Sequence, residues 1–301
     1  MVSSQSLVIE TIGLTKKFGS ATALGGLDLA VSEGEVHGFL GPNGSGKSTT
    51  IRILLGLMKP TGGTARVLGL DPWAQPVATH RDIAYVPGDV SLWPNLSGGE
   101  AIDLLTKLRG GASAVRRAQL IDEFELDPRK KARTYSKGNR QKVALIAAFA
   151  RPAKLYILDE PSSGLDPVME SVFRVQIERA RADGATVLLS SHVLSEVEQL
   201  CDRLTIIRAG VAVETGSLID LRHLSRTSFR VGGIQVDSVA GVRGVHDVRA
   251  HGDAIEFEVD AADMATVLKA VAGLPSTSLT VAPASLESLF LRHYSELTEA
   301  V

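Results

Sequence analysis

The apolar positions of this chain fall into short runs that alternate with stretches of helical spacing. Residues 35–40 form one such run, and residues 48–58 then carry apolar side chains three and four positions apart. The alternation continues and predicts strands at 83–86, 155–158 and 186–190 and helices at 142–150, 171–182 and 193–201. Short apolar strands separated by helices predict an α/β fold with a mostly parallel sheet covered on both faces.

Two segments interrupt this alternation. Residues 8–13 and 26–31 are expected as two further strands, the N-terminal antiparallel strands of the fold. Residues 100–125 are helical throughout, with a break at Gly110-Gly111 and no strand signal. We therefore expect a helical subdomain, at about residues 88–152, inserted into a first domain that spans residues 1–218.

The composition changes at 218–228, which we interpret as a linker to a second domain at 219–301. Strands are expected there at 229–236, 245–250, 254–259 and 278–281, and a helix at 262–272. The segment His251-Gly-Asp253 makes the middle strands a hairpin. This order predicts a small α+β, ferredoxin-like domain whose first helix is reduced to 237–243. A last helix is expected from Ser285, with an apolar stripe that packs against the chain.

Composition and charge exclude several classes of protein. The 301 residues are 44% hydrophobic with a net charge of −2, so no strong positive field favours nucleic acid. Cys201, the single cysteine, fits a reducing compartment. The N-terminus lacks the pattern of a secretory signal, and no run approaches the roughly 18 apolar residues of a membrane span. If the protein serves a membrane, we expect another chain to cross it.

Residues 41–48 match the phosphate-binding loop pattern G-x-x-x-x-G-K-[ST] at every position. The expected ATP-binding residues are Gly41, Pro42, Asn43, Gly44, Ser45, Gly46, Lys47, Ser48 and the following Thr49. Glycines let successive N–H groups point at phosphate oxygens, and the following helix adds its positive dipole end. Lys47 supplies a cation for the β- and γ-phosphates, while the Ser48 hydroxyl ligates Mg²⁺.

Three more polar residues follow predicted strands. Asp159 and Glu160 end the apolar run 155–158, and His192 follows the strand at 186–190. The carboxyl ends of parallel strands converge on the ligand. We expect Asp159 to hold Mg²⁺, Glu160 to polarise the attacking water, and His192 to face the γ-phosphate.

The order of these motifs carries a family resemblance. Between the phosphate loop and the Asp159-Glu160 strand lies Tyr135-Ser-Lys-Gly-Asn-Arg-Gln-Lys142, a helix start, and Ser163-Gly-Leu-Asp166 follows the strand. In this order the motifs make residues 7–218 resemble the ATPase subunit of an ATP-binding cassette (ABC) transporter. The resemblance implies the P-loop NTPase fold of the ABC cassette and hydrolysis of ATP with Mg²⁺.

The resemblance also assigns roles to single residues. Phe18 matches the aromatic residue that stacks on adenine, and His192 the switch histidine. Ser136 and Gly138 match the signature that caps the γ-phosphate of ATP bound by the opposite subunit, and the loop of Asp166 crosses between subunits. The implied partners are a second copy of the chain, in an ATP-dependent head-to-tail dimer, and a separate transmembrane permease. The implied location is the cytoplasmic side of the plasma membrane.

Four residues bear on two departures from the family pattern. Lys137 stands where the signature usually has glycine, and Asn139 where it often has glutamine. Gly88 replaces the glutamine that usually reaches Mg²⁺ and water, so Asp89 is a candidate substitute.

The segment 88–95, the Tyr-Ser-Lys-Gly signature and the tail at 285–290 resemble subunits of drug-exporter type, in particular the daunorubicin-resistance group. Trp93 is either part of this resemblance or a core residue. Import and a non-transport ABC ATPase, acting on ribosomes, DNA or iron–sulfur scaffolds, remain alternatives to export. For the domain after residue 218, regulation of the dimer and a passive structural role both remain open.

Overall fold

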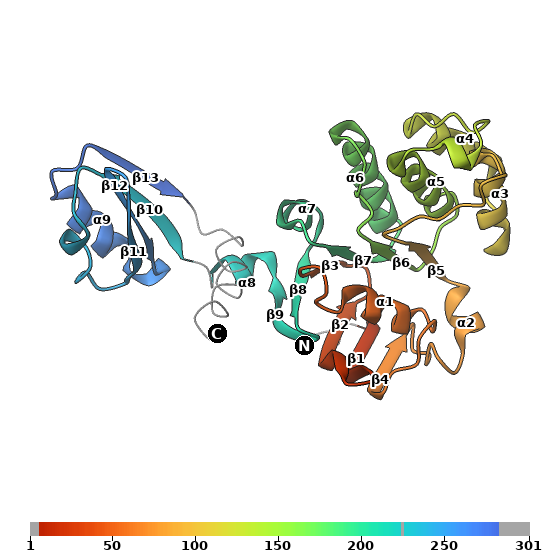
Figure 1. Ribbon diagram of the computed structural model, residues 1–301, viewed down its shortest axis with the longest axis horizontal. Coiled ribbons are helices and arrows are strands. Elements are labelled where there is room, and N and C mark those ends of the chain that lie inside the picture. The colour runs from red at the N-terminus through yellow and green to blue at the C-terminus, as the bar shows by residue number, and fades with distance from the viewer. Residues whose placement is uncertain (1–5, 224–225, 283–301) are drawn as a thin grey trace. The chain divides into compact units, whose positions relative to one another are not determined.

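The computed structural model describes residues 6–223 and 226–282 (Figure 1). The chain divides into two compact units, Met1–Thr215 and Gly216–Val301, and each is described by itself. No helix in the described ranges is long and apolar enough to cross a membrane.

A six-stranded sheet forms the centre of the first unit. Its strand order is β5-β6-β7-β3-β8-β9, and the neighbours from β5 to β8 run parallel. The strands are β3 (Val36–Leu40), β5 (Ile83–Val86), β6 (Leu155–Asp159), β7 (Thr186–Ser191), β8 (Arg203–Arg208) and β9 (Val211–Ser217). Every residue of β3, β6 and β7 is buried, as expected for strands covered on both faces. The predicted α/β fold with a mostly parallel sheet is confirmed.

A second, antiparallel sheet has the order β2-β1-β4 and consists of β1 (Leu7–Phe18), β2 (Ala21–Ser32) and β4 (Gly62–Val67). The helix after the phosphate loop, α1 (Lys47–Leu54), packs against this sheet and β6. The sequence pattern predicts that this helix extends to residue 58. It ends earlier because Gly56 takes a φ of 63° and an added Cβ there would overlap the Pro72 carbonyl oxygen.

The predicted helical block consists of α3 (Gly98–Leu108) and α4 (Ala114–Glu123), both of which pack on α5 (Lys137–Phe149). Ser97 and Glu100 form a capping box at the start of α3. The expected break between α3 and α4 is present, since Gly110 and Gly111 have φ values of 94° and 92°. Helices α6 (Pro167–Ala182) and α7 (Leu194–Leu200) follow the strands β6 and β7 (Figure 1).

The second unit is a four-stranded antiparallel sheet with one longer helix. Its order is β11-β12-β10-β13, so the first strand lies between the third and the fourth. Its elements are α8 (Leu218–His223), β10 (Thr227–Gly232), β11 (Val245–His251), β12 (Ala254–Val259), α9 (Met264–Ala272) and β13 (Ser278–Ala282). Phe229 and Phe257 stack with their ring centroids 5.3 Å apart in a core separate from that of the first unit.

Two elements of this region differ from the sequence prediction, and a third lies outside the described residues. The segment 218–228 is not only a linker, because α8 occupies its first half. The reduced first helix is a single 3₁₀ turn, Val236–Ser238. The helix expected from Ser285 lies outside the described residues.

Candidate functional site

The phosphate loop, residues 41–48, is a tight turn between β3 and α1. The N–H of Gly41 donates to the carbonyl of Ser191 at 3.2 Å, and an added Cβ at Gly41 would overlap the Ile207 carbonyl oxygen. Gly44 and Gly46 have φ values of 83° and 112°, which glycine adopts without strain. Both the backbone conformation and the space at the loop therefore require glycine at these positions.

Several features of the loop fit a phosphate group. Gly46 caps α1 without any side-chain hydrogen bond to the first-turn N–H groups, and no acidic residue lies in that turn. The Ser45 hydroxyl is buried, and no described residue accepts or donates a hydrogen bond to it. First-turn N–H groups that no side chain caps and a buried hydroxyl can donate to an anion, and the helix dipole attracts its charge.

Lys47 brings positive charge to this loop and is only 5% exposed. Its ammonium donates to the carbonyls of Gly41 at 2.5 Å and Pro42 at 3.2 Å, and it lies 3.7 Å from Oε1 of Glu160. Burial lowers the pKa of Lys47, while Glu160 and Asp159 act in the opposite direction. A buried cation beside the start of α1, where no side chain caps the first-turn N–H groups, is suited to binding phosphate oxygens.

Ser48 and Asp159 lie together at the start of α1 and the end of β6. The Ser48 hydroxyl donates to Oδ2 of Asp159 at 3.2 Å, and the Ser190 hydroxyl donates to Oδ1 of the same carboxylate. The described residues contain no cluster of three or more histidine, cysteine or acidic residues that could hold a metal alone. One hydroxyl and one carboxylate fit Mg²⁺, which takes few protein oxygens and completes its shell with water and phosphate.

Glu160 is held in an unusual conformation directly after β6. Its φ is 46°, and its N–H donates to the Ser190 carbonyl at 3.0 Å. Its Oε1 lies 3.2 Å from Nδ1 of His192, whose side chain is 47% exposed. A strained φ persists where the surroundings impose it, which often occurs at functional sites. The structure thus brings Lys47, Ser48, Asp159, Glu160 and His192 to one end of the parallel sheet.

Gly88 lies against this site. A Cβ added to Gly88 would be 3.2 Å from the backbone oxygen of Asp159 and 3.7 Å from its carboxyl carbon. Asp89, the candidate substitute for the missing glutamine, is exposed. Position 88 is therefore where a side chain would reach the carboxylate, and the assignment of that role to Asp89 stays a prediction.

The signature residues form a second group of contacts. The Ser136 hydroxyl caps α5 by accepting from the N–H of Asn139 at 3.2 Å. An added Cβ at Gly138 would overlap the Gly164 carbonyl oxygen, and Lys137 donates to the Ser163 hydroxyl at 2.6 Å. The signature is thus joined to the loop after Glu160 within one chain.

Asp166 and Phe18 complete the predicted set. Asp166 caps α6 through hydrogen bonds from the N–H groups of Val168 and Met169, both 3.0 Å long. Phe18 is half exposed at the end of β1, with the Lys16 ammonium 5.1 Å from its ring centroid. No hydrogen bond or ion pair found in residues 6–223 links Phe18, Ser136, Gly138 or Asp166 to the phosphate loop.

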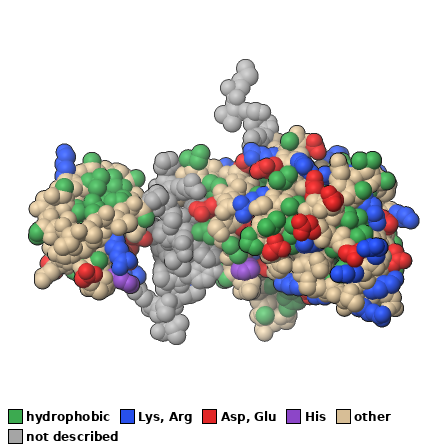
Figure 2. Space-filling model, turned by 90° about the horizontal axis from the view of Figure 1, so that it is seen from above, with side chains coloured by type: hydrophobic (Ala, Val, Ile, Leu, Met, Phe, Trp, Pro, Cys, Tyr) green, Lys and Arg blue, Asp and Glu red, His purple; other side chains and the backbone are tan. Residues whose placement is uncertain are grey.

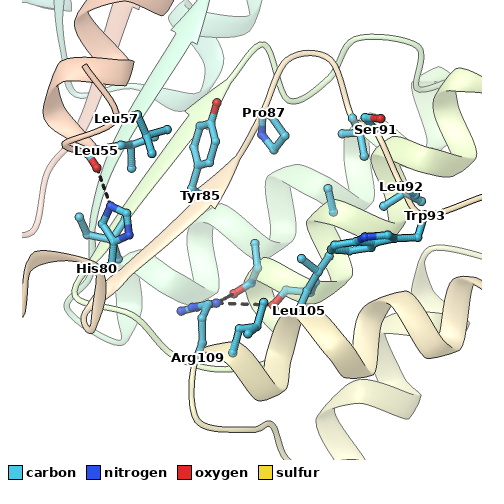
Figure 3. Close-up of a pocket in the computed structure, with 16 residues that line it drawn as sticks. Leu55, Leu57, His80, Tyr85, Pro87, Ser91, Leu92, Trp93, Leu105 and Arg109 are labelled. Carbon is cyan, nitrogen blue, oxygen red and sulfur yellow. Dashed lines mark hydrogen bonds between the residues drawn. The ribbon is translucent and has the colours of Figure 1, made fainter. Parts of the chain in front are cut away.

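The first unit contains an apolar groove that the sequence did not indicate (Figure 3). Its cavity volume is about 490 Å³, and Tyr85, Pro87, Trp93, Leu105, Leu108 and Arg109 are among its lining residues. Trp93 is 49% exposed, so it is not the core residue that the sequence left open. Burial, chiefly, raises the pKa of Tyr85 to about 12, with Asp159 contributing.

Comparison with known proteins gives one consistent family. The family model described as ABC transporter matches residues 24–163. The daunorubicin/doxorubicin resistance ATP-binding protein DrrA of Streptomyces peucetius is 41% identical over 71% of this chain and 66% of its own length. The bacitracin transport ATP-binding protein BcrA of Enterococcus faecalis is 35% identical over 74% of each chain. The daunorubicin resistance ATP-binding protein DrrA2 of Streptomyces coeruleorubidus is 32% identical over 95% of this chain and 96% of its own.

Solved structures agree with this family. An ATP-binding subunit of an ABC transporter has 32% identity and a TM-score of 0.67, over 72% of this chain and 92% of the other. A dimeric ATP-binding cassette bound to ADP and Pi in a post-hydrolysis state has 25% identity and a TM-score of 0.64, over 70% and 98%. The predicted family and ATPase activity are confirmed: the chain belongs to the ABC transporter family, as an ATP-hydrolysing subunit with an ABC cassette fold.

Proposed function

We propose that this protein hydrolyses MgATP to power an ABC exporter of drugs or other hydrophobic compounds. The observation that carries the ATPase part is the convergence of Lys47, Ser48, Asp159, Glu160 and His192 at one end of the sheet. Export is supported by the relatives named for daunorubicin resistance and bacitracin transport. Import and non-transport roles are the alternatives that the experiment below separates.

In this proposal each residue does one task. Lys47 and the N–H groups of the loop bind the β- and γ-phosphates, while Ser48 and Asp159 hold Mg²⁺, which neutralises phosphate charge. The Glu160 carboxylate orients and polarises the attacking water as general base. His192, within hydrogen-bonding distance of Glu160, contacts the γ-phosphate and the base together.

The catalytic unit is proposed to be a head-to-tail dimer of two copies. Ser136 and Gly138 start α5, so an exposed helix N-terminus is available to cap a γ-phosphate in the partner's site. The loop that carries Ser163 and Gly164 touches this signature and follows Glu160 directly. In this proposal, binding of the second copy therefore affects the position of the Glu160 carboxylate. Phe18 stacks on adenine in the same proposal.

A separate membrane permease is the second proposed partner, and its cytoplasmic segment is the proposed occupant of the groove in Figure 3. The groove presents exposed apolar side chains, including Trp93 and Leu108. Tyr85 and Pro87 in its wall lead to Gly88, which lies against Asp159. A partner seated there is therefore one short segment away from the proposed magnesium ligand. In this proposal the protein acts at the cytoplasmic side of the membrane.

Nucleic acid is not among the proposed partners. Acidic and basic side chains are interspersed on the face of the first unit that Figure 2 displays, and the net charge of the chain is −2. A binding surface for nucleic acid needs a positive stripe or patch. For the domain after residue 218 we propose regulation or stabilisation of the dimer.

Transport in vesicles tests this function. The chain is co-expressed with the membrane protein encoded beside it, and daunorubicin and bacitracin are the probes. We expect ATP-dependent accumulation in inside-out vesicles that is absent with Glu160→Gln and reduced, with ATPase retained, in Trp93→Ala. Accumulation only in right-side-out vesicles would indicate import. The proposal would be contradicted if the permease did not change the ATPase activity and neither probe accumulated in vesicles of either orientation.

A further inference from the structure

Helix α7 carries a partly buried acid, Glu196, that the proposed mechanism does not use. Glu196 lines a small cavity of about 180 Å³ together with Ser162, Glu170 and Phe173. Its Oε1 is shielded from solvent, and no described residue forms a hydrogen bond with it. A carboxyl group in such surroundings destabilises a fold unless its polar contacts compensate, so its presence needs an explanation.

The strongest contact of Glu196 is with Ser191, the residue before His192. The Ser191 hydroxyl donates to Oε2 of Glu196 at 2.6 Å and accepts from the N–H of Val193 at 2.9 Å. The hydroxyl therefore bridges the acid and the residue after His192. These two bonds fix the turn on which His192 stands.

The backbone around Ser191 contacts the rest of the catalytic site. The Ser191 carbonyl accepts from the N–H of Gly41, and the Ser190 carbonyl accepts from the N–H of Glu160. The Ser190 hydroxyl also bonds to Asp159. Residues 190–192 thus touch the phosphate loop, the proposed metal ligand and the proposed base, and Glu196 holds this segment from the side of α7.

Ser162, in the segment after Glu160, lines the same cavity as Glu196. Burial raises the pKa of Glu196, while the hydroxyls of Ser191 and Ser162 act in the opposite direction. Ser162 belongs to the loop that begins directly after Glu160 and leads to the signature contacts at Ser163 and Gly164. The acid therefore lies between the segment that carries His192 and the segment that leaves Glu160.

We propose that Glu196 is a positioning residue for ATP hydrolysis, which holds Ser191 and thereby keeps His192 in register with Glu160. The proposal rests on the roles given above to Glu160 and His192. Glu196 does not touch the nucleotide in this account. A loss of alignment at a reacting group slows turnover while it leaves nucleotide binding to the phosphate loop intact.

The test compares Glu196→Ala with Glu196→Gln in the full-length chain. Glutamine keeps an acceptor for Ser191, whereas alanine removes it. We expect Glu196→Ala to lower kcat by on the order of 10-fold, with the KM for ATP and the Kd for nucleotide within about twofold of wild type. Glu196→Gln should recover at least half of the lost activity. The matched control is Glu178→Ala, which removes an exposed carboxylate from α6 that does not line this cavity and should leave kcat unchanged.

A double-mutant cycle with Ser191→Ala decides whether the effect passes through that hydroxyl. If it does, Ser191→Ala lowers kcat by a similar factor and adds little to Glu196→Ala. Full activity in a folded Glu196→Ala protein, or strictly additive losses, would overturn the proposal. If Glu196→Ala does not fold, Ser191→Ala and Glu196→Gln decide it, because normal kcat in Ser191→Ala removes the link. Glu160→Gln, measured in parallel, separates failure of this proposal from failure of the proposed base.

Discussion

Oε1 of Glu160 lies 3.2 Å from Nδ1 of His192 and 3.7 Å from the ammonium of Lys47. The three residues follow three different strands of one parallel sheet, β6, β7 and β3. The carboxylate is therefore within reach of both the cation proposed to bind phosphate and the histidine proposed to face it. This arrangement gives each of the three side chains a separable effect on binding or turnover.

Glu160→Gln should lower steady-state ATP turnover by about 10²-fold or more while MgATP still binds, because the amide cannot act as a general base. Turnover is measured by phosphate release and binding by a fluorescent ATP analogue. Glu178→Gln, an exposed carboxylate on α6, is the matched control. Near-normal turnover in Glu160→Gln would remove this residue from the role of base.

Lys47→Ala should weaken nucleotide binding itself by roughly ten- to a hundredfold, since a charge-assisted hydrogen bond contributes about 1.5–3 kcal/mol. Isothermal titration with MgATP gives the affinity. Lys59→Ala removes an exposed lysine beyond the end of α1 and should bind normally. Equal affinities for the two variants would show that Lys47 does not contact the phosphates.

Ser136 has a cap role and a proposed phosphate role, and two substitutions separate them. Ser136→Ala should cost about 1 kcal/mol of stability through loss of the cap, whereas Ser136→Asp keeps a capping acceptor. Both proteins are measured by light scattering with ATP in the Glu160→Gln background. The protein that keeps Ser136 should be a dimer, and the Ser136→Asp protein should be a monomer because the added charge repels the partner's γ-phosphate.

The protein without nucleotide should be mostly monomeric in the same experiment. A dimer in Ser136→Asp with ATP would place Ser136 away from the partner's nucleotide. Equal mass with and without ATP in Glu160→Gln would contradict the shared site, unless the second unit dimerises by itself.

Truncation after His223 should leave MgATP binding intact, because the phosphate loop and both sheets of the first unit precede this point. We expect altered dimerisation or altered coupling of the ATPase to the permease. Circular dichroism establishes that the shortened chain is folded. A folded chain that no longer binds nucleotide would refute this division of labour, and unchanged dimerisation and coupling would favour a passive role.

The sequence missed strands β4, β8 and β9 and the short helix α2. Strands β8 and β9 contain short apolar runs that were not assigned, whereas β4 and α2 lie in segments with few consecutive apolar side chains. In β4, Val67 is the only fully buried residue. Such a strand exists because β1 offers it a partner for hydrogen bonding, and no pattern within the strand itself contains that information.

The sequence alone determined the family, the order of most strands and helices, and the residues of the phosphate loop. It could do so because the glycines, Lys47 and Ser48 act through chemistry that their own spacing specifies. Only the tertiary structure decided four contacts. They are Glu160 with His192, Gly138 with Gly164, Gly88 with Asp159, and the hydrogen bond between Ser191 and Glu196. These pairs come from segments far apart in the chain or from opposite sides of a turn. Their distances depend on how the parallel strands align, and local sequence does not encode that alignment.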